Sequence, residues 1–304
     1  MSENNIFITL THYSIDTPGS FDTTYPWYIP HEHTGIGNML FQISAGLAYA
    51  TKHNKTLYVP GLQTYLTLES LEKRDTIFRN INSECPSEYL QVMNHPIKLS
   101  GENNREYILD TSPFENMNFF GYFENFRNLT EYRSIILDCF RPLPYEQHNI
   151  HKKYPAILEE DVCSVHVRLG SDYFKIPEIR NQLGEYQRGY LECVDHMIQT
   201  KNIKKFVVLT DNRNYCKYIF DKNPKYTGIQ FIYSDEKDYV DIWIISLIKN
   251  NIVSVSTLAW WGSFLNEHDD QYIVCYETNR PDLHYPGWTI VPKRIGDESW
   301  SDIK

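Results

Sequence analysis

Long apolar segments are missing from this 304-residue chain. A helix that crosses a bilayer needs roughly 20 consecutive, mostly apolar residues, and the sequence holds no such run. The N-terminus also lacks a basic segment followed by an apolar stretch, which is the pattern of a secretory signal peptide. We therefore expect a cytoplasmic protein without a membrane span.

Positive charge is scarce as well. The chain has 29 Lys and Arg residues against 39 Asp and Glu residues, which gives a formal net charge of −10. A protein that binds nucleic acid non-specifically needs a basic surface to neutralise phosphates. The composition therefore argues against nucleic acid as a partner. An anionic ligand would have to be held by local groups against the field of the whole protein.

Several motifs of other enzyme classes do not occur. The sequence has no Gly-x-Ser-x-Gly, no P-loop and no Gly-x-Gly-x-x-Gly, so hydrolases, nucleoside triphosphatases and dinucleotide-binding proteins lose support. The six cysteines are scattered without a Cys-x-x-Cys pair, which favours buried reduced thiols. His31, Glu32 and His33 have no obvious third partner for a metal ion.

The second half of the chain alternates between strand and helix patterns. Apolar runs bounded by turn residues predict strands at 162–168, 205–210, 229–233, 252–255 and 272–276. Between them, helical periodicity predicts helices at 190–200, 214–220, 240–249 and 258–266. Such a βαβ series predicts a doubly wound parallel sheet.

The first half is less regular. Strands are expected at 6–10, 57–59 and from 119, and helices at 39–50, 68–74 and 132–140. The connection at 11–34 has a length that is usually functional or mobile, and the proline-rich stretch at 142–155 is the candidate linker. We therefore expect two domains, at 1–155 and 156–304.

The strand at 162–168 carries the main candidate site and ends in a Gly170-Ser171-Asp172 turn. Alternation places Val165 and Val167 on one face and His166 and Arg168 on the other. Ligands of parallel α/β sheets bind at the carboxyl ends of the strands. The guanidinium of Arg168 offers a planar fork of donors suited to phosphate. An ordinary strand end with a surface arginine is the alternative interpretation.

Polar residues follow the other predicted strands of this half, and the carboxyl ends of parallel strands share one edge of the sheet. Asp211 suits a ribose or sugar hydroxyl, or a helix cap. Ser256 and Thr257 begin a helix, where hydroxyl and free N–H groups cap the helix or hold a phosphate. The complete set at this edge is Arg168, Asp172, Thr210, Asp211, Asn212, Ser234, Asp235, Ser256 and Thr257.

Two glycine-containing segments flank helices. Gly35, Gly37 and Asn38 form a loop that opens a helix, and its free N–H groups suit an oxyanion. A tight turn that needs glycine for steric reasons is the alternative. In Trp260-Trp261-Gly262, the aromatic rings are expected to pack a helix on the sheet while Gly262 allows a close approach; sugar stacking is the less favoured interpretation.

Together these segments resemble the α-1,2-fucosyltransferases of glycosyltransferase family 11. Gly35-Ile36-Gly37-Asn38-Met39-Leu40-Phe41-Gln42 resembles the family's Gly-Leu-Gly-Asn-Gln-Met-Phe-Gln block, and Gly121-Tyr122-Phe123-Glu124 its Gly-Tyr-Phe-Gln block. The segment from His166 to Tyr173 is similar to His-x-Arg-Arg-Gly-Asp-Tyr. Val208-Leu209-Thr210-Asp211 is similar to Phe-Ser-Asp-Asp, and residues 241–266 to the long C-terminal block.

The resemblance implies a GT-B fold, with two Rossmann-like domains and the active site in the cleft between them. It implies inverting transfer of L-fucose from GDP-fucose to the 2-hydroxyl of a terminal galactose on a glycan, with no metal or other cofactor. No Asp-x-Asp motif, which metal-dependent sugar transferases of the other common fold use, is present. Arg168 matches the arginine that contacts the donor diphosphate, His166 shapes its loop, and Gly37 and Asn38 face the cleft. Asp172, Glu32 and His33 are candidates for a base.

The chain also departs from the family pattern. Leu169 stands where the family block has a second arginine, Ser171 is inserted before Asp172, and Glu124 replaces glutamine. The connection at 11–34 is an insertion relative to the family, which goes almost directly from the first strand to its Gly-x-Gly-Asn block. These departures leave three alternatives open: a fucosyltransferase of another linkage, a transferase of another GDP-sugar, and a non-catalytic nucleotide- or glycan-binding module.

Overall fold

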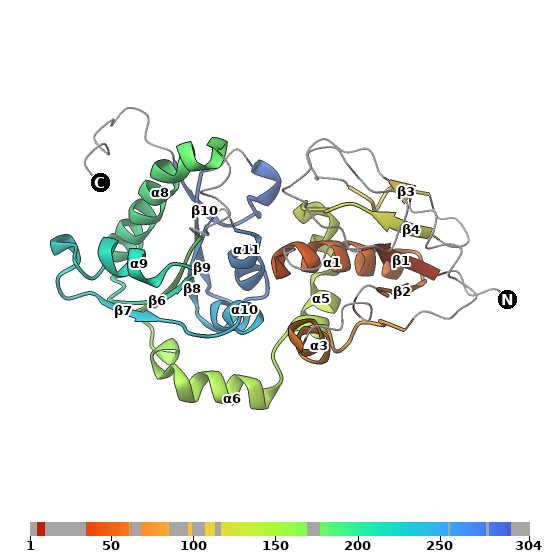
Figure 1. The fold of residues 1–304 in the computed structure, drawn as a ribbon, viewed down its shortest axis with the longest axis horizontal. Helices are drawn as coiled ribbons and strands as arrows, with labels where there is room; N and C mark the ends of the chain where they lie inside the picture. The colour runs from red at the N-terminus through yellow and green to blue at the C-terminus, as the bar shows by residue number, and fades with distance from the viewer. Residues whose placement is uncertain are drawn as a thin grey trace. The chain divides into compact units, whose positions relative to one another are not determined.

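The computed structural model describes residues 5–9, 35–60, 62, 68–84, 97–98, 107–112, 117–168, 177–254, 256–277 and 280–292. The chain divides into two units, Met1–Arg141 and Pro142–Lys304. Each unit holds its own parallel sheet (Figure 1). The division falls between Arg141 and Pro142, on the N-terminal side of helix α6 (Pro144–Lys153). The boundary expected from the sequence lies on the other side of that helix.

The stretch at 142–155, expected to be a linker, is largely helical. Pro144 stands at the first position of α6, where the N–H that proline lacks would have no helical partner in any case. The backbone N–H of Leu143 donates to Oε2 of Glu146 at 2.6 Å, which caps the helix start. A 3-10 helix, η5 (Pro155–Leu158), then leads into the second unit's first strand. Proline here begins helices rather than interrupting the chain.

Unit 1 is built on a four-stranded parallel sheet in the order β2-β1-β4-β3. The strands are β1 (Asn5–Thr9), β2 (Thr56–Tyr58), β3 (Ile97–Lys98) and β4 (Met117–Phe120), and the helices include α1 (Ile36–Lys52), α3 (Leu68–Asp75) and α5 (Arg133–Phe140). The strands and helices expected in this half are confirmed to within a few residues, except that β3 was not expected. The connection at 11–34 lies outside the described residues.

Helix α1 begins earlier than expected. Gly35 is its N-cap, and the N–H of Asn38 already donates to the carbonyl of Gly35 at 3.0 Å. The expected loop at 35–38 is therefore the cap and first turn of the helix. Ile36 is buried, so the apolar face of α1 starts before the residue at which periodicity placed it.

Unit 2 contains a six-stranded parallel sheet in the order β10-β9-β8-β5-β6-β7. The predicted doubly wound parallel sheet is confirmed. Its strands are β5 (Val162–Val167), β6 (Lys205–Thr210), β7 (Gln230–Tyr233), β8 (Asn250–Val253), β9 (Tyr272–Tyr276) and β10 (Thr289–Val291), and its helices are α8 (Pro177–Lys201), α9 (Arg213–Ile219), α10 (Asp238–Leu247) and α11 (Thr257–Phe264). The edge strand β10 was not expected.

The strand order reverses in the middle of this sheet. The chain runs outward from β5 through β6 to β7, and then returns to place β8 on the other side of β5. Parallel crossovers that run in opposite directions place their helices on opposite faces. In Figure 1, α8 and α9 lie on one side of the strands, and α10 and α11 on the other. The β5–β8 pair is therefore a topological switch point, where open α/β sheets bind ligands.

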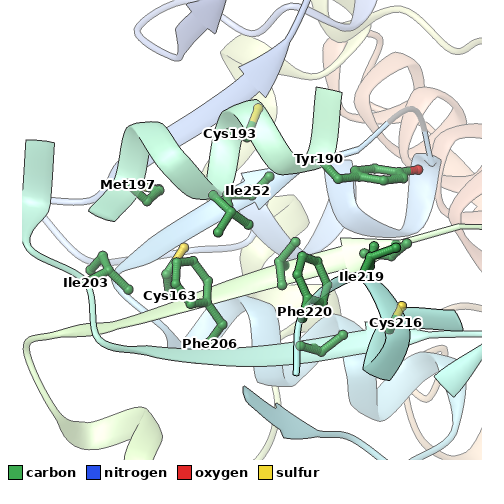
Figure 2. Close-up of a cluster of buried hydrophobic side chains, with 14 of the residues drawn as sticks. Cys163, Tyr190, Cys193, Met197, Ile203, Phe206, Cys216, Ile219, Phe220 and Ile252 are labelled. Atoms are coloured by element: carbon green, nitrogen blue, oxygen red, sulfur yellow. The ribbon is translucent and has the colours of Figure 1, made fainter. Parts of the chain in front are cut away.

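One face of this sheet packs against α8 and α9. Figure 2 shows the buried side chains between them, including Cys163 of β5, Phe206 of β6 and Cys193 of α8. Val165 and Val167 belong to this cluster. The two valines therefore share one face of β5, as predicted. Because neighbouring side chains of a strand point to opposite faces, His166 is directed away from the α8 and α9 layer.

On the other face, α10 and α11 pack closely together. Trp260 and Trp261 are 1% and 0% exposed, which confirms their role in packing. A Cβ added to Gly262 would lie 2.5 Å from Cβ of Ile245 in α10. Gly262 is therefore the point at which the two helices approach, as expected from the sequence.

The described thiols agree with the expectation of buried, reduced cysteines. Among the described residues, Cys139, Cys163, Cys193, Cys216 and Cys275 are free, and all but Cys139 are buried. Burial raises the pKa of the Cys163 and Cys193 thiols well above its ordinary value, which keeps them protonated. None of the described helices is long and apolar enough to span a bilayer.

Candidate active site

The candidate site lies at the carboxyl ends of β5 and β8, the two strands at the switch point. Arg168 directly follows β5, and Ser254 directly follows β8. Register pairs Val165 with Ile252, so the two chain segments leave the sheet side by side. The next strand along, β6, pairs with β5 up to Thr210 and brings Asp211 to the same edge. Arg168 and Asp211, which were predicted to share one edge, therefore do so.

Arg168 forms an ion pair with Asp211 across neighbouring strand ends. Its Nη1 donates to Oδ2 of Asp211 at 2.7 Å, and the two side chains are 34% and 25% exposed. A partly exposed pair of this kind contributes only about 0–1 kcal/mol. The guanidinium that binds the Asp211 carboxylate also has the geometry to bind the paired oxygens of a phosphate. The sequence did not predict this pairing.

The backbone of Arg168 is held by helix α8. The hydroxyl of Tyr190 lies 3.4 Å from both the backbone nitrogen and the carbonyl oxygen of Arg168. Tyr190 is only 3% exposed, so its ring is fixed in the core between α8 and the sheet. The arginine thus projects from a backbone whose position is determined by packing.

His166 is buried beside the arginine and is neutral. Its Nδ1 lies 3.0 Å from Oγ of Ser254. Burial, and to a smaller extent the nearby charge of Arg168, lower the pKa of His166 to about 3. At neutral pH the imidazole is therefore an uncharged hydrogen-bonding group beside the Arg168 cation.

The start of helix α11 completes this part of the site. Oγ of Ser256 accepts a hydrogen bond from the N–H of Leu258 at 3.3 Å, so Ser256 is the N-cap of α11. The N–H of Ser256 donates to Oγ of Ser254 at 3.1 Å. The capping interpretation of Ser256 is confirmed, and Thr257 is the first residue of the helix. The positive end of the helix dipole stands at this edge, where it favours an anion.

At the end of β6, the polar residues Thr210 and Asn212 form hydrogen bonds within their own turn. Oγ1 of Thr210 accepts from the N–H of Asn212 at 3.0 Å, and Oδ1 of Asn212 accepts from the N–H of Tyr215 at 3.1 Å. Asn212, rather than Asp211, therefore caps α9. This leaves the Asp211 carboxylate to face Arg168.

At the end of β7, Ser234 is the centre of a hydrogen-bonded turn. Its hydroxyl donates to Oδ1 of Asp241 at 2.5 Å and accepts from the N–H of Glu236 at 3.2 Å. Its carbonyl accepts from Nη2 of Arg213 at 2.7 Å. Burial raises the pKa of Asp241, the hydrogen bond from Ser234 opposes the rise, and the nearby acidic residues add to it. The net pKa is about 7.

The raised pKa of Asp241 predicts a pH-dependent effect on stability. The folded protein binds the proton more tightly than the unfolded chain, so this group stabilises the fold at low pH and the contribution is lost as pH rises through about 7. Asp241→Asn keeps an oxygen acceptor for Ser234 and removes the charge. We compare the free energy of unfolding of Asp241→Asn with that of the unaltered protein. The difference should shift in favour of the variant by roughly 1–3 kcal/mol when the pH is raised from about 5 to about 8.5. Chemical denaturation at both pH values measures this; an equal difference at both would contradict it.

The neighbouring Asp235 forms structural contacts with the end of helix α6. The hydroxyl of Tyr154 donates to Oδ1 of Asp235 at 2.7 Å, and Nζ of Lys153 lies 2.6 Å from the same carboxylate. These bonds lower the pKa of Asp235 to about 2, the one from Lys153 most. The end of α6 and the β7–α10 turn are thereby fastened together.

Of the other predicted site residues, three belong to unit 1 and three fall outside the described residues. Gly35, Gly37 and Asn38 are in unit 1, at the cap and first turn of α1. Glu32, His33 and Asp172 lie outside the described residues. Within the described part of the chain, no three His, Cys, Asp or Glu side chains gather in a way that could hold a metal ion. Two members of the site, Ser254 and Asp241, were not singled out from the sequence. The available signal was their spacing, because Ser254 lies two residues before Ser256 and Asp241 lies seven residues after Ser234.

Comparisons with known proteins agree on one family and one fold. A family model described as Glycosyl transferase family 11 matches residues 105–289. An Escherichia coli protein named alpha-1,2-colitosyltransferase is 24% identical over 255 residues, which cover 77% of this chain and 86% of that protein. The E. coli O-antigen biosynthesis glycosyltransferase WbnK is 26% identical over 162 residues, 51% of this chain and 52% of its own.

Solved structures resemble the chain at the level of fold. The NodZ alpha-1,6-fucosyltransferase co-crystallized with GDP has a TM-score of 0.50 at 11% identity, covering 86% of this chain and 92% of that one. POFUT1 in complex with GDP has a TM-score of 0.52 at 13% identity, covering 90% and 98%. The predicted GT-B fold is confirmed by these similarities and by the two parallel sheets.

Proposed function

Because this chain belongs to glycosyl transferase family 11 and is a glycosyltransferase, we propose that it transfers L-fucose from GDP-fucose to the 2-hydroxyl of a terminal galactose. The observation that carries the proposal is the position of Arg168, a cation at the switch point of the unit 2 sheet beside the start of α11. This is where a nucleotide diphosphate binds in open α/β sheets. Two structures of similar fold were determined with GDP bound, which supports a guanosine nucleotide as the carrier.

The proposed reaction is a single displacement with inversion. The acceptor hydroxyl attacks the anomeric carbon, the bond from that carbon to the β-phosphate oxygen breaks, and GDP leaves with the bonding electrons. Arg168 and the first N–H groups of α11 stabilise the negative charge that grows on the phosphate. A donor aimed at developing charge is worth about 2.7–4 kcal/mol in comparable sites. The hydroxyl proton passes to a base or to water, and Asp172, Glu32 and His33 stay the candidates for that base.

We propose that no metal ion takes part, because Arg168 and the dipole of α11 together would neutralise the leaving group. Arg168 supplies a charge that does not dissociate near neutral pH, and its fork matches two phosphate oxygens at once. The dipole of α11 adds partial positive charge at the same edge. Both act without a bridging cation.

The linkage and the acceptor are tested by product analysis. The protein is incubated with GDP-fucose and a β-galactoside such as lactose, and the product linkage is read by two-dimensional NMR. We expect fucose attached α-1,2 to galactose, which is the linkage in the name of the E. coli colitosyltransferase. Fucose on another position of galactose would overturn the linkage and keep the enzyme class. Transfer only to another sugar or to a peptide hydroxyl would overturn the acceptor.

A second candidate donor is the colitosyl group, because the relative that aligns over 77% of this chain bears that name. Colitose is fucose without its 3-hydroxyl, so the two donors differ by one polar group. A site that hydrogen-bonds this hydroxyl would discriminate strongly against the deoxy sugar, whereas an apolar site would discriminate weakly. Competition between GDP-fucose and GDP-colitose for the same acceptor decides between them, and the preferred donor has the higher kcat/KM.

A further inference from the structure

A hydrogen bond joins the ends of β5 and β8 at the switch point. Nδ1 of His166 lies 3.0 Å from Oγ of Ser254, and the two side chains are only 6% and 7% exposed. The same Ser254 oxygen accepts from the backbone N–H of Ser256 at 3.1 Å, just ahead of helix α11. One hydroxyl thus contacts both the imidazole and the turn that begins the helix.

The position of the hydrogen atoms follows from these contacts. A serine hydroxyl has one hydrogen to donate and two lone pairs with which to accept. Ser254 uses one lone pair for the N–H of Ser256. Among the residues that the structure describes, Nδ1 of His166 is the acceptor within reach of its hydrogen. Leaving a buried donor unsatisfied is costly, so the hydroxyl donates to Nδ1.

An imidazole that accepts at Nδ1 carries its own proton at Nε2 when it is neutral. His166 is neutral at physiological pH, because burial and the neighbouring charge of Arg168 lower its pKa to about 3. The two ring nitrogens therefore have different roles. Nδ1 is engaged inside the protein, and Nε2 is an N–H donor.

We propose that Ser254 is a positioning residue that holds His166 as the Nε2–H tautomer, so that the imidazole offers the nucleotide sugar a hydrogen-bond donor beside Arg168. The group it contacts on the ligand is then an acceptor, such as a phosphate or carbonyl oxygen. This inference rests on the proposed function for the identity of the ligand. The tautomer itself is a property of the protein without ligand and stands separately.

The coupling to helix α11 gives Ser254 a second effect. Without its hydroxyl, the N–H of Ser256 loses an acceptor at the same time as Nδ1 of His166 loses a donor. Both changes occur at the edge where the diphosphate is expected. Binding of the nucleotide sugar should therefore suffer more than the chemical step, which depends on Arg168.

The test is NMR of protein with 15N-labelled histidine, in which imidazole nitrogen shifts distinguish the two neutral tautomers. His166 is assigned from the signal that disappears in His166→Gln. We expect the Nε2–H tautomer to dominate in the unaltered protein and in Ser254→Thr, which keeps the hydroxyl, and a mixture in Ser254→Ala. The control is Ser263→Ala, another buried serine, on α11, which should leave the His166 signals unchanged.

Kinetics then connect the tautomer to function. Ser254→Ala should lower kcat/KM by about 3- to 10-fold, the size of one hydrogen bond, chiefly through a higher KM for the nucleotide sugar, and Ser254→Thr should restore it. A dominant Nδ1–H tautomer in the unaltered protein overturns the inference, as does a Ser254→Ala variant whose tautomer is unchanged. If Ser254→Ala does not fold, the unaltered protein and Ser254→Thr still decide the tautomer. If the unaltered protein turns over no GDP-sugar, the proposed function is overturned. The tautomer signal is measured without ligand, so it still shows separately whether the inference about Ser254 holds.

Discussion

Replacing Arg168 by alanine is expected to lower turnover by about 100- to 1,000-fold while leaving the fold intact. The loss follows from removing one preorganised donor at a developing negative charge, which is worth about 2.7–4 kcal/mol. The fold should survive because the ion pair with Asp211 is partly exposed and contributes only about 0–1 kcal/mol. Initial rates of GDP release, with a thermal melt to check folding, measure both quantities.

The controls for this prediction separate the bidentate geometry of the guanidinium from its positive charge. Lys204→Ala removes one positive charge just before β6, at the opposite end of the strands from Arg168, and should leave the rate unchanged. Arg168→Lys keeps the charge and loses the bidentate geometry, so it should recover only part of the rate. Near-normal turnover in Arg168→Ala would contradict the assignment of the donor site.

Replacing Gly262 by valine is expected to destabilise unit 2 by about 3 kcal/mol or more. The new Cβ would lie 2.5 Å from Cβ of Ile245, and 3.1 Å from the backbone carbonyl of Ile242. Because these atoms belong to or adjoin the backbone of α10, the helices must move apart, and overpacking of this kind costs about 1–3 kcal/mol and sometimes more. Denaturant unfolding followed by tryptophan fluorescence reports it, since five of the six tryptophans lie in unit 2.

The comparison for this prediction is a glycine with space around it. A Cβ added to Gly35 meets no atom within 4 Å, and its φ of −56° is open to alanine. Gly35→Ala should cost less than about 1 kcal/mol, the size of a weakened N-cap. A Gly262→Val variant that is no less stable than Gly35→Ala would show that the helix contact at Ile245 does not limit packing.

The regular part of the fold could be predicted because its signals are local. In unit 2, each apolar run is long enough to form a buried strand, and each is followed by turn residues and a helical pattern. That arrangement leaves a parallel sheet as the natural solution. The strands that were not expected, β3 and β10, have two and three residues. A segment so short carries no period that distinguishes a strand from a loop.

The prolines around α6 show why a local signal can mislead. Pro142, Pro144 and Pro155 suggested a break in the chain, yet Pro144 and Pro155 each start a helical segment. The distinguishing signal was Glu146, which supplies the acceptor for the N–H of Leu143. Proline followed two residues later by an acidic residue indicates a helix start as readily as a linker.

At the site, the sequence predicted the edge but not the partners. Residues after parallel strands gather at one edge whatever the order of the strands, so Arg168, Asp211 and Ser256 could be grouped. The pairs within that group depend on which strands are neighbours. Only the placement of β5 between β6 and β8 brings Arg168 to Asp211 and His166 to Ser254. Strand order is a long-range property that no short pattern encodes.

The measurement that tests the central claim most directly is the rate of GDP release from GDP-fucose, with and without lactose, in the presence of EDTA. The site described here predicts release that the acceptor stimulates and that EDTA does not reduce, because Arg168 and helix α11 neutralise the leaving phosphate. Loss of release in EDTA, restored by a divalent cation, would contradict the metal-free mechanism. A protein that neither releases nor binds GDP would contradict the donor site at the end of β5.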